Sequence, residues 1–384
     1  MGALEFPVHL SSHIGNFIKC LHRESREMDL KVKQEYLEKA VRLHEENPVV
    51  DAHLDLAGEI LLRQKNGERD IVKNHYLRNF KAAGINLIFS SVYIENGVLE
   101  ERKGEKPAPG WENALLQIRA LKEDVEELPD VVLLYEKKDL DRVLTEKKTG
   151  ILIYMEGLDC IGEDISRLDQ LYDLGIRGCA LTWSRTNSLG TGCCKASEHR
   201  QIPGDLTDAG IEAVRHMEEK SMFLDVSHLN DEGFGQVCQI AKRPFIATHS
   251  GSRTVFDNYR NLTDAQMDAL ARQGGIIGVN GCKYIAGSAG GNHLEMLCRH
   301  IEYETEMIGA GHVGYGFDLC DSYDRAKAAL KKEMVSSRDD CLLHHGQIPL
   351  LTAALLQRGM GEQEVKGIIG GNFVEYLQRV VFTS

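Results

Sequence analysis

The chain has 384 residues, 42% of them hydrophobic, which is enough to bury a large core. Its 58 acidic and 45 basic residues give a formal net charge of -13, which argues against a nucleic-acid partner because polyanions bind basic surfaces. No apolar stretch approaches the ~20 residues of a membrane span, and the start lacks the basic and apolar regions of a signal peptide. We therefore expect a cytoplasmic protein with no membrane partner.

Residues 1–47 are predicted to form an N-terminal helical extension, because apolar residues recur at near-helical spacing among charges in 28–47. From residue 48 to residue 384, short apolar runs alternate with longer helical patterns, which is typical of repeated βα units. Eight runs are found, at 49–55, 85–94, 150–157, 177–183, 221–228, 244–250, 275–280 and 312–318. Eight units predict one α/β domain, a (β/α)8 barrel of the TIM type, rather than an open sheet.

Several of these runs end in residues that can bind metals or carry charge. They are His53 and Asp55 on the first run, Glu156 on the third, His228 on the fifth, His249 on the sixth and Asp318 on the eighth. In a (β/α)8 barrel the carboxyl ends of the strands form a single rim, which carries the chemistry. Residues far apart in the sequence are thus expected to converge.

Metal binding is the chemistry that this residue set favours. His53 and Asp55 are two apart on a strand and share a face, although a lone pair of this kind also fits a simple hydrogen bond. A buried Glu156 is costly unless it is paired or bound to a metal. Single histidines at strand ends are usually core residues, but three imidazoles and two carboxylates at one rim suit zinc, with Glu156 able to bridge two ions.

Three further features lie outside this set. Asp318 could exchange protons with water and a leaving amine, or could orient a ligand histidine. Arg260, in a loop after the sixth run, could bind a substrate carboxylate or could be a solvated arginine. The ten cysteines include no CxxC pair, and Cys193 and Cys194 with His199 fit no common zinc module, so we expect neither a disulfide framework nor a thiolate metal site.

From about residue 49 to about residue 380 the chain resembles the membrane dipeptidase family, also called renal dipeptidase or peptidase family M19. The matching segments are VDAHLD, YMEG, LTW…N, GDLTDAGIEAV, LDVSH, THSGSR…RN, VGYGFD and IIGGNFVEYL. The family is a metal-dependent (β/α)8 barrel of the amidohydrolase superfamily. The resemblance alone also suggests a homodimer.

The resemblance implies roles for individual residues. One zinc would be held by His53, Asp55 and Glu156, and a second by Glu156, His228 and His249, with Glu156 bridging. Arg260 matches the family's arginine for the substrate carboxylate, and Asp318 matches its proton-handling aspartate. A hydroxide bridging the two zinc ions would then attack the amide bond of a dipeptide.

One position departs from the family. Renal-type members have a histidine after the Leu-Thr of the fourth strand, whereas this chain has Trp183, whose indole offers one N–H donor to a substrate. The alternative of an amidohydrolase acting on N-acyl amino acids, lactams or lactones therefore stays open. A barrel that has lost activity and serves as a binding subunit is a second alternative, which the full set of ligand residues argues against.

Overall fold

The computed structural model describes residues 8–27, 30–101, 110–194, 201–288, 293–335 and 339–383. Within them, eight parallel strands follow one another in the order β1, β2, β4, β5, β6, β7, β8 and β9. They span Val49–Leu54, Ile85–Tyr93, Thr149–Glu156, Ile176–Ala180, Phe223–Asp225, Ala247–Ser250, Ile277–Val279 and Val313–Tyr315. Six of the eight predicted runs contain one of these strands, and the other two overlap β4 and β5, which begin one residue earlier, at Thr149 and Ile176. A short strand, β3 (Val131–Leu133), pairs with β4 beside the ring and is not among the predicted runs.

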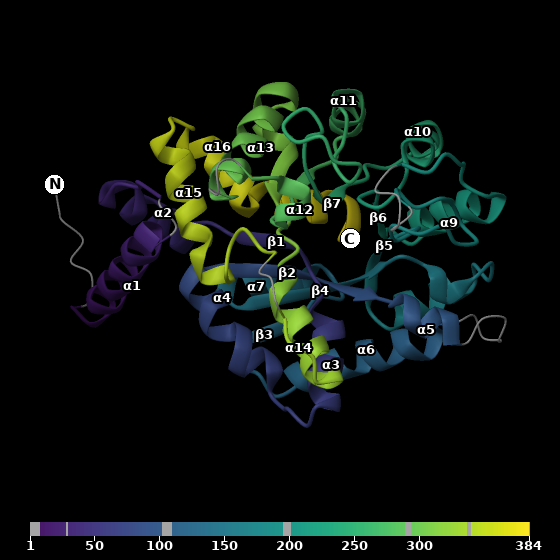
Figure 1. Ribbon diagram of the computed structural model, residues 1–384, viewed down its shortest axis with the longest axis horizontal. Helices are drawn as coiled ribbons and strands as arrows, with labels where there is room; N and C mark the ends of the chain where they lie inside the picture. Colours follow the sequence, from purple (N-terminus) through teal and green to yellow (C-terminus); the bar gives the residue numbers. More distant parts are fainter. Residues whose placement is uncertain are drawn as a thin grey trace.

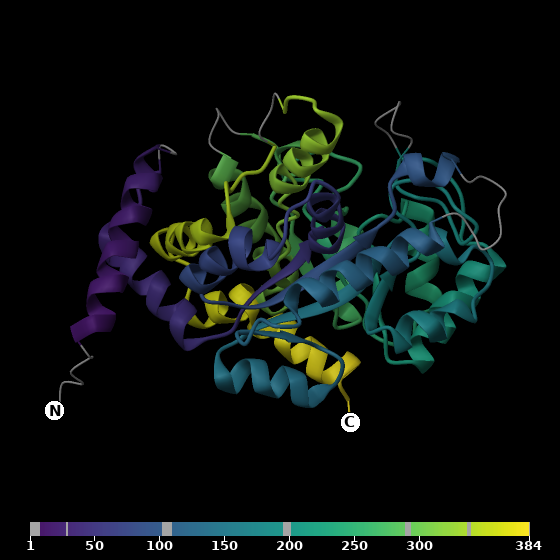
Figure 2. The same cartoon turned by 90° about the horizontal axis from the view of Figure 1, so that it is seen from below.

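Two weaker joints close the strands into a barrel. Between β6 and β7, a single parallel bridge joins Asp225 to Ile246. Between β9 and β1, the backbone N–H that follows β9, at Asp318, donates to the carbonyl oxygen of His53 at 3.3 Å. Helices lie on both sides of the strands in Figures 1 and 2. The closed (β/α)8 architecture expected from the sequence is confirmed.

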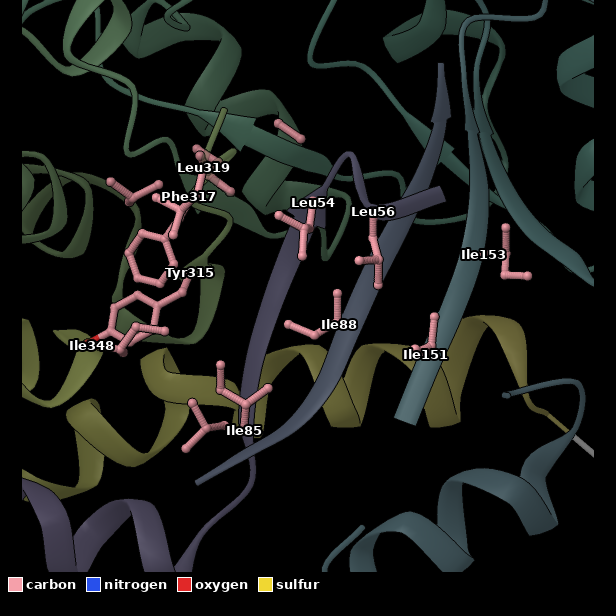
Figure 3. Close-up of a cluster of buried hydrophobic side chains, with 14 of the residues drawn as sticks. Leu54, Leu56, Ile85, Ile88, Ile151, Ile153, Tyr315, Phe317, Leu319 and Ile348 are labelled. Carbon is pink, nitrogen blue, oxygen red and sulfur yellow. The ribbon is translucent and has the colours of Figure 1, made fainter. Parts of the chain in front are cut away.

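Aromatic side chains from opposite sides of the ring fill the barrel interior. The ring of Phe223 on β6 lies 5.6 Å from Phe89 on β2 and 5.5 Å from Tyr154 on β4, measured between centroids. Phe373, from the C-terminal helical segment, lies 5.6 Å from Phe89. That segment crosses beneath the strands at the ends where they begin (Figure 3). The opposite, carboxyl ends are where polar side chains gather.

The outer face of the strands packs against the surrounding helices. Figure 3 shows Leu54, Ile88 and Ile151 pointing away from β1, β2 and β4, and each is at most 1% exposed. Removing a side chain of this size from water contributes about 1.5–3 kcal/mol. The barrel wall thus separates two apolar layers.

Two helices precede β1, namely α1 (Val8–Glu27) and α2 (Gln34–Glu46), seen at the left of Figure 1. Helix α2 packs on α15 (Ile348–Gln357). The buried His44 fixes this contact, because its Nδ1 lies 2.7 Å from the carbonyl oxygen of Ala83 and its Nε2 lies 2.8 Å from Thr352 Oγ1. The division at residue 47 into an extension and a barrel domain stays a prediction.

The remaining helices lie after β1. They are α3 (Leu56–Lys65), α4 (Leu77–Ala83), α5 (Asn96–Glu101), α6 (Trp111–Val125), α7 (Lys137–Glu146), α8 (Arg167–Asp173), α9 (Asp208–Glu219), α10 (Asp231–Ile240), α11 (Asp264–Arg272), α12 (Lys283–Ala286), α13 (His293–Ile308), α14 (Asp321–Lys331), α16 (Glu362–Lys366) and α17 (Asn372–Tyr376). Among the described residues, none of the helices has the length and apolarity needed to span a membrane.

Candidate metal centre

Three histidines face one glutamate at the carboxyl rim of the barrel. The Nε2 atoms of His228, His249 and His53 lie 2.8, 3.5 and 3.8 Å from the Glu156 carboxylate oxygens. His53 Nε2 also lies 3.7 Å from Asp55 Oδ1 and 3.4 Å from Asp318 Oδ1. The residues predicted from strands one, three, five, six and eight therefore converge at one place.

An irregularity in β1 directs His53 into this centre. Val50 and Ala52 belong to the interior layer, so strict alternation would turn His53 outward and Leu54 inward. Instead Leu54 packs in the outer layer, and the pairing of β1 with β2 shifts register between Asp51 and Leu54. A bulge of this kind re-aims a side chain. Here it places His53 inside the rim.

Hydroxyl groups orient all three imidazoles. The Nδ1 atoms of His53, His228 and His249 are hydrogen-bonded to Tyr154 Oη, to Ser184 Oγ at 2.9 Å and to Thr248 Oγ1 at 2.7 Å, in that order. When Nδ1–H donates to a hydroxyl oxygen, the lone pair of Nε2 is left for another partner. All three Nε2 atoms face Glu156.

Burial sets the charge state of the centre. The side chain of Glu156 is buried, and this burial raises the pKa of its carboxyl group well above the usual value. The positive charge of His53 opposes the rise in this pKa, and the nearby carboxylate of Asp55 adds to it. Burial, with the positive charge of Arg260, lowers the pKa of His228 and His249 well below the usual value. Both imidazoles are therefore neutral at pH 7, which is the form that binds metals.

The donor set fits divalent cations. His53 Nε2 is buried and has no hydrogen-bond partner among the described residues. Burial lowers the pKa of His53, but the charges of Glu156 and Asp318 outweigh it and raise the pKa to about 10, so the surroundings favour positive charge at this point. The donor atoms of three overlapping groups lie within 4.8 Å of one another: His53 with Asp55 and Glu156, Glu156 with His228 and His249, and His53 with His249 and Asp318. The first two groups share Glu156, as the resemblance implies for a bridging ligand.

Asp318 stands at the edge of this set. Asn280 Nδ2 donates to its Oδ2 at 3.1 Å and the Cys320 thiol donates to its Oδ1 at 3.3 Å. Its backbone adopts a φ of 52°, in the left-handed region that disfavours residues with a side chain. Strain of this kind is concentrated at functional sites. Burial raises the carboxyl pKa, with Asp55 adding to the rise and His53 opposing it.

Arg260 is buried beside the histidines rather than solvated in its loop. It is 4% exposed and donates to the carbonyl oxygens of Ser227 and, at 3.3 Å, of His249. Its Nη2 also lies 3.3 Å from His228 Nε2. A buried guanidinium at this distance from the candidate ligands can receive an anionic group of a substrate.

Trp183 forms one wall of the centre. Its ring stacks on His228 with 5.6 Å between centroids and lies 5.1 Å from the ring of Tyr93. The Arg185 guanidinium lies 5.3 Å from the Trp183 ring and is held by Asp159 at 3.0 and 3.1 Å. The indole is thus fixed in an aromatic layer over the ligand His228.

The orienting residues are absent from the sequence predictions. Tyr154 stands two positions before Glu156 on the same strand, so the alternation of β4 could have indicated it. Ser91 donates to Asp55 Oδ1 and pairs in register with Tyr154, which only the sheet pairing reveals. Ser184 comes from a different loop than its partner His228, and the sequence gives no signal for that contact. His199 lies outside the described residues.

Comparison with known proteins gives one family. A family model described as membrane dipeptidase (peptidase family M19) matches residues 37–384. Dipeptidase 3 of Rattus norvegicus is 27% identical over 360 residues, which cover 89% of this chain and 67% of the relative. Dipeptidase verJ of Clonostachys rogersoniana is 29% identical over 238 residues, or 62% of this chain and 57% of the relative. The matches span between 56% and 69% of the curated relatives' lengths.

Solved structures share the fold. A metallopeptidase from Rhodobacter sphaeroides, liganded with a phosphinate mimic of the dipeptide L-Ala-D-Ala, has a TM-score of 0.72 at 22% identity, covering 87% of this chain and 99% of that one. The probable dipeptidase PvdM from Pseudomonas aeruginosa has a TM-score of 0.73 at 20% identity, covering 91% and 100%. At these identities the likeness establishes the barrel architecture.

Proposed function

Because this chain belongs to the membrane dipeptidase family, peptidase family M19, we propose that it is a zinc-dependent dipeptidase that hydrolyses the amide bond of dipeptides. The observation that carries the proposal is the convergence of three imidazoles on Glu156, with the buried Nε2 of His53 left without a hydrogen-bond partner among the described residues. The relatives named as dipeptidases and the neighbour that binds a dipeptide mimic support the substrate class.

Two cations would be shared among five side chains. His53, Asp55 and Glu156 would hold one, and Glu156, His228 and His249 the other. When bound, divalent zinc supplies Lewis acidity, which polarises the scissile carbonyl and lowers the pKa of water. Tyr154, Ser184 and Thr248 keep the imidazole Nε2 atoms aimed at the shared glutamate, which reduces the reorganisation needed on binding.

Arg260 and Asp318 would carry out the remaining steps. Arg260 would hold the free carboxylate of the substrate, which would favour short peptides that end within reach of the centre. Asp318 would accept a proton from the attacking water at a carboxylate oxygen and return it to the departing amine. Asn280 and Cys320 hold that carboxylate in place by donating to its two oxygens.

Trp183 is the residue that favours an alternative substrate class, the N-acyl amino acids. Where renal-type members have histidine, the indole N–H is a donor but cannot exchange a proton near pH 7. The ring stacks on His228 and packs on Tyr93, so it also offers an apolar wall to a substrate. A substrate with an apolar acyl group in place of an amino-terminal residue, such as an N-acyl amino acid, would suit that wall.

The test is a substrate panel on the full chain. L,L- and L,D-dipeptides and N-acetyl amino acids are compared before chelation, after chelation and after return of zinc. We expect dipeptide hydrolysis that chelation abolishes and zinc restores. Faster hydrolysis of N-acetyl amino acids would select the alternative, and no hydrolysis by a zinc-loaded chain would indicate a binding subunit. The homodimer and the cytoplasmic location stay predictions from the sequence.

A further inference from the structure

One arginine outside the proposed chemistry joins three of the segments that follow the strands. The Arg185 guanidinium donates to Asp159 Oδ1 and Oδ2 at 3.1 and 3.0 Å. It also donates to Asn96 Oδ1 at 3.1 Å and to the carbonyl oxygen of Ile94 at 2.8 Å. These partners follow β2 and β4, whereas Arg185 follows β5. Four of its five N–H donors are thus used within the chain, which leaves little capacity to bind a substrate anion.

The same guanidinium lies over two aromatic rings at the rim. Its Cζ atom is 5.3 Å from the ring centroid of Trp183 and 5.6 Å from that of Tyr93. The two ring centroids are 5.1 Å apart. A guanidinium at this distance attracts the electron-rich face of a ring. Trp183 and Tyr93, which we call the aromatic wall, are therefore held by one shared cation.

The aromatic wall borders the candidate metal centre. Tyr93 ends β2 and pairs in register with Glu156, the shared ligand of the proposed cation pair. Trp183 stacks on His228, with 5.6 Å between the ring centroids. Neither Tyr93 nor Trp183 is fully buried, so both have surface available to a ligand. A substrate that reacts at the centre would therefore lie next to the wall.

The position of Arg260 indicates which part of a dipeptide would face the wall. Arg260 belongs to the loop after β7, whereas the wall stands on β2 and on the segment after β5. When Arg260 holds the carboxylate of the second residue, the first residue is the part that remains to face the wall. Aromatic rings pack best on other aromatic or apolar groups. A large apolar side chain on the first residue is thus the group that fits.

We propose that Arg185 is a positioning residue that holds the aromatic wall, and that the wall gives a preference for dipeptides whose first residue has an aromatic side chain. The preference rests on the proposed function, whereas the positioning of Trp183 does not. Without the guanidinium, Trp183 loses its cation contact and the three segments lose their common partner. An aromatic first residue should then bind more weakly, while the Ser184 hydroxyl still orients His228.

The first experiment measures the position of Trp183 without a substrate. The chain has two tryptophans, so Trp111→Phe leaves Trp183 as the only indole that fluoresces. In the zinc-loaded full chain with that change, Arg185→Gln should raise acrylamide quenching several-fold and shift the emission to longer wavelength. Asp159→Asn keeps the guanidinium but weakens its ion pair, so it should give a smaller change in the same direction.

Arg177→Gln is the matched control for the quenching. The Arg177 guanidinium is also largely buried and lies 4.1 Å from the ring centroid of Tyr172. It donates to the carbonyl oxygens of Tyr172 and Tyr135, both at 2.8 Å. Arg177 stands near the start of β5, at the end of the barrel opposite the rim. Its replacement should therefore leave the quenching of Trp183 unchanged.

The second experiment compares L-Phe-L-Ala with L-Ala-L-Ala, which share the second residue. The parent chain should have the lower KM for L-Phe-L-Ala. Arg185→Gln should raise that KM about 2- to 10-fold, with kcat and zinc content nearly unchanged and L-Ala-L-Ala within about twofold. Trp183→Leu should remove the same preference. The double variant should lose no more than Trp183→Leu alone, because Arg185 acts through Trp183.

Each arm has a result that would overturn its part of the inference. Unchanged quenching in both Arg185→Gln and Asp159→Asn would overturn the positioning role, whether or not the chain hydrolyses dipeptides. Increased quenching with equal changes in KM for the two dipeptides would keep the positioning and overturn the preference. Loss of zinc in Arg185→Gln would assign Arg185 to support of the metal centre instead. A parent chain that hydrolyses neither dipeptide would contradict the proposed function and the preference together, while the quenching still decides the positioning.

Discussion

Replacing Arg260 with lysine should weaken the use of dipeptides that carry a free carboxylate and spare substrates that lack one. Arg260 uses two of its five N–H donors in hydrogen bonds to the carbonyl oxygens of Ser227 and His249. The remaining donors are available for a bidentate contact with the substrate. Lysine keeps the positive charge but cannot present two parallel donors to a carboxylate. The change therefore removes one hydrogen bond to a charged group.

The expected size follows from that one bond. A hydrogen bond to a charged group contributes about 1.5–3 kcal/mol, which corresponds to about a 10- to 150-fold fall in kcat/KM. The assay compares an L,L-dipeptide with its C-terminal amide, for which the variant should stay within about threefold of the parent chain. Arg253→Lys is a matched control, because its guanidinium pairs with Asp231 at 2.9 Å.

Equal losses for the dipeptide and its amide would refute this reasoning. Arg260 also supports the backbone of the ligand His249, so a general loss of activity would mean that it maintains the centre instead of binding substrate. Zinc content measured on the same samples separates these readings, since support of the ligands predicts loss of metal.

Three further predictions concern single residues. Asp318→Asn should lower kcat by about 10²- to 10⁴-fold with zinc still bound, and near-normal turnover would remove Asp318 from proton transfer. Tyr154→Phe should weaken zinc binding about 10- to 100-fold in competition with a chelator, and unchanged affinity would show that its bond to His53 is dispensable. Burial lowers the pKa of His44 from 6.5 to about 4, so the unfolded chain binds more protons in this window. In urea unfolding, His44 should contribute about 3 kcal/mol to the loss of stability as the pH drops from 6.5 to 4, so the fall in His44→Gln should be smaller by about that amount; equal slopes would contradict the assignment.

Much of the barrel is predictable because its strands are buried on both faces. Segments 85–94 and 150–157 are mostly apolar runs bounded by helical patterns, and they coincide with β2 and β4 to within one residue. Strand β3 lies in the apolar run 131–135, which is not among the eight predicted runs. It pairs with β4 alone and stands beside the ring, so the count of eight βα units does not call for it.

The centre is predictable for a different reason. A closed parallel barrel brings the carboxyl ends of its strands to one rim, so the types of residue at 53, 156, 228 and 249 are informative once the barrel is assumed. The orientation of the ligand side chains is harder to predict from the sequence. Simple alternation from Val50 would have turned His53 outward, and only the register shift in β1 turns it inward. The hydroxyl of Ser184 reaches His228 across a loop contact that no periodicity encodes, whereas Thr248 stands directly before its partner His249 on β7.

Elemental analysis of the purified full chain is the most direct test of the proposed centre. If His53, Asp55, Glu156, His228 and His249 hold a cation pair, the chain should contain about two divalent ions after zinc loading. His228→Ala should then reduce the content to about one. A correctly folded parent chain that retains no metal under the same conditions would contradict the account.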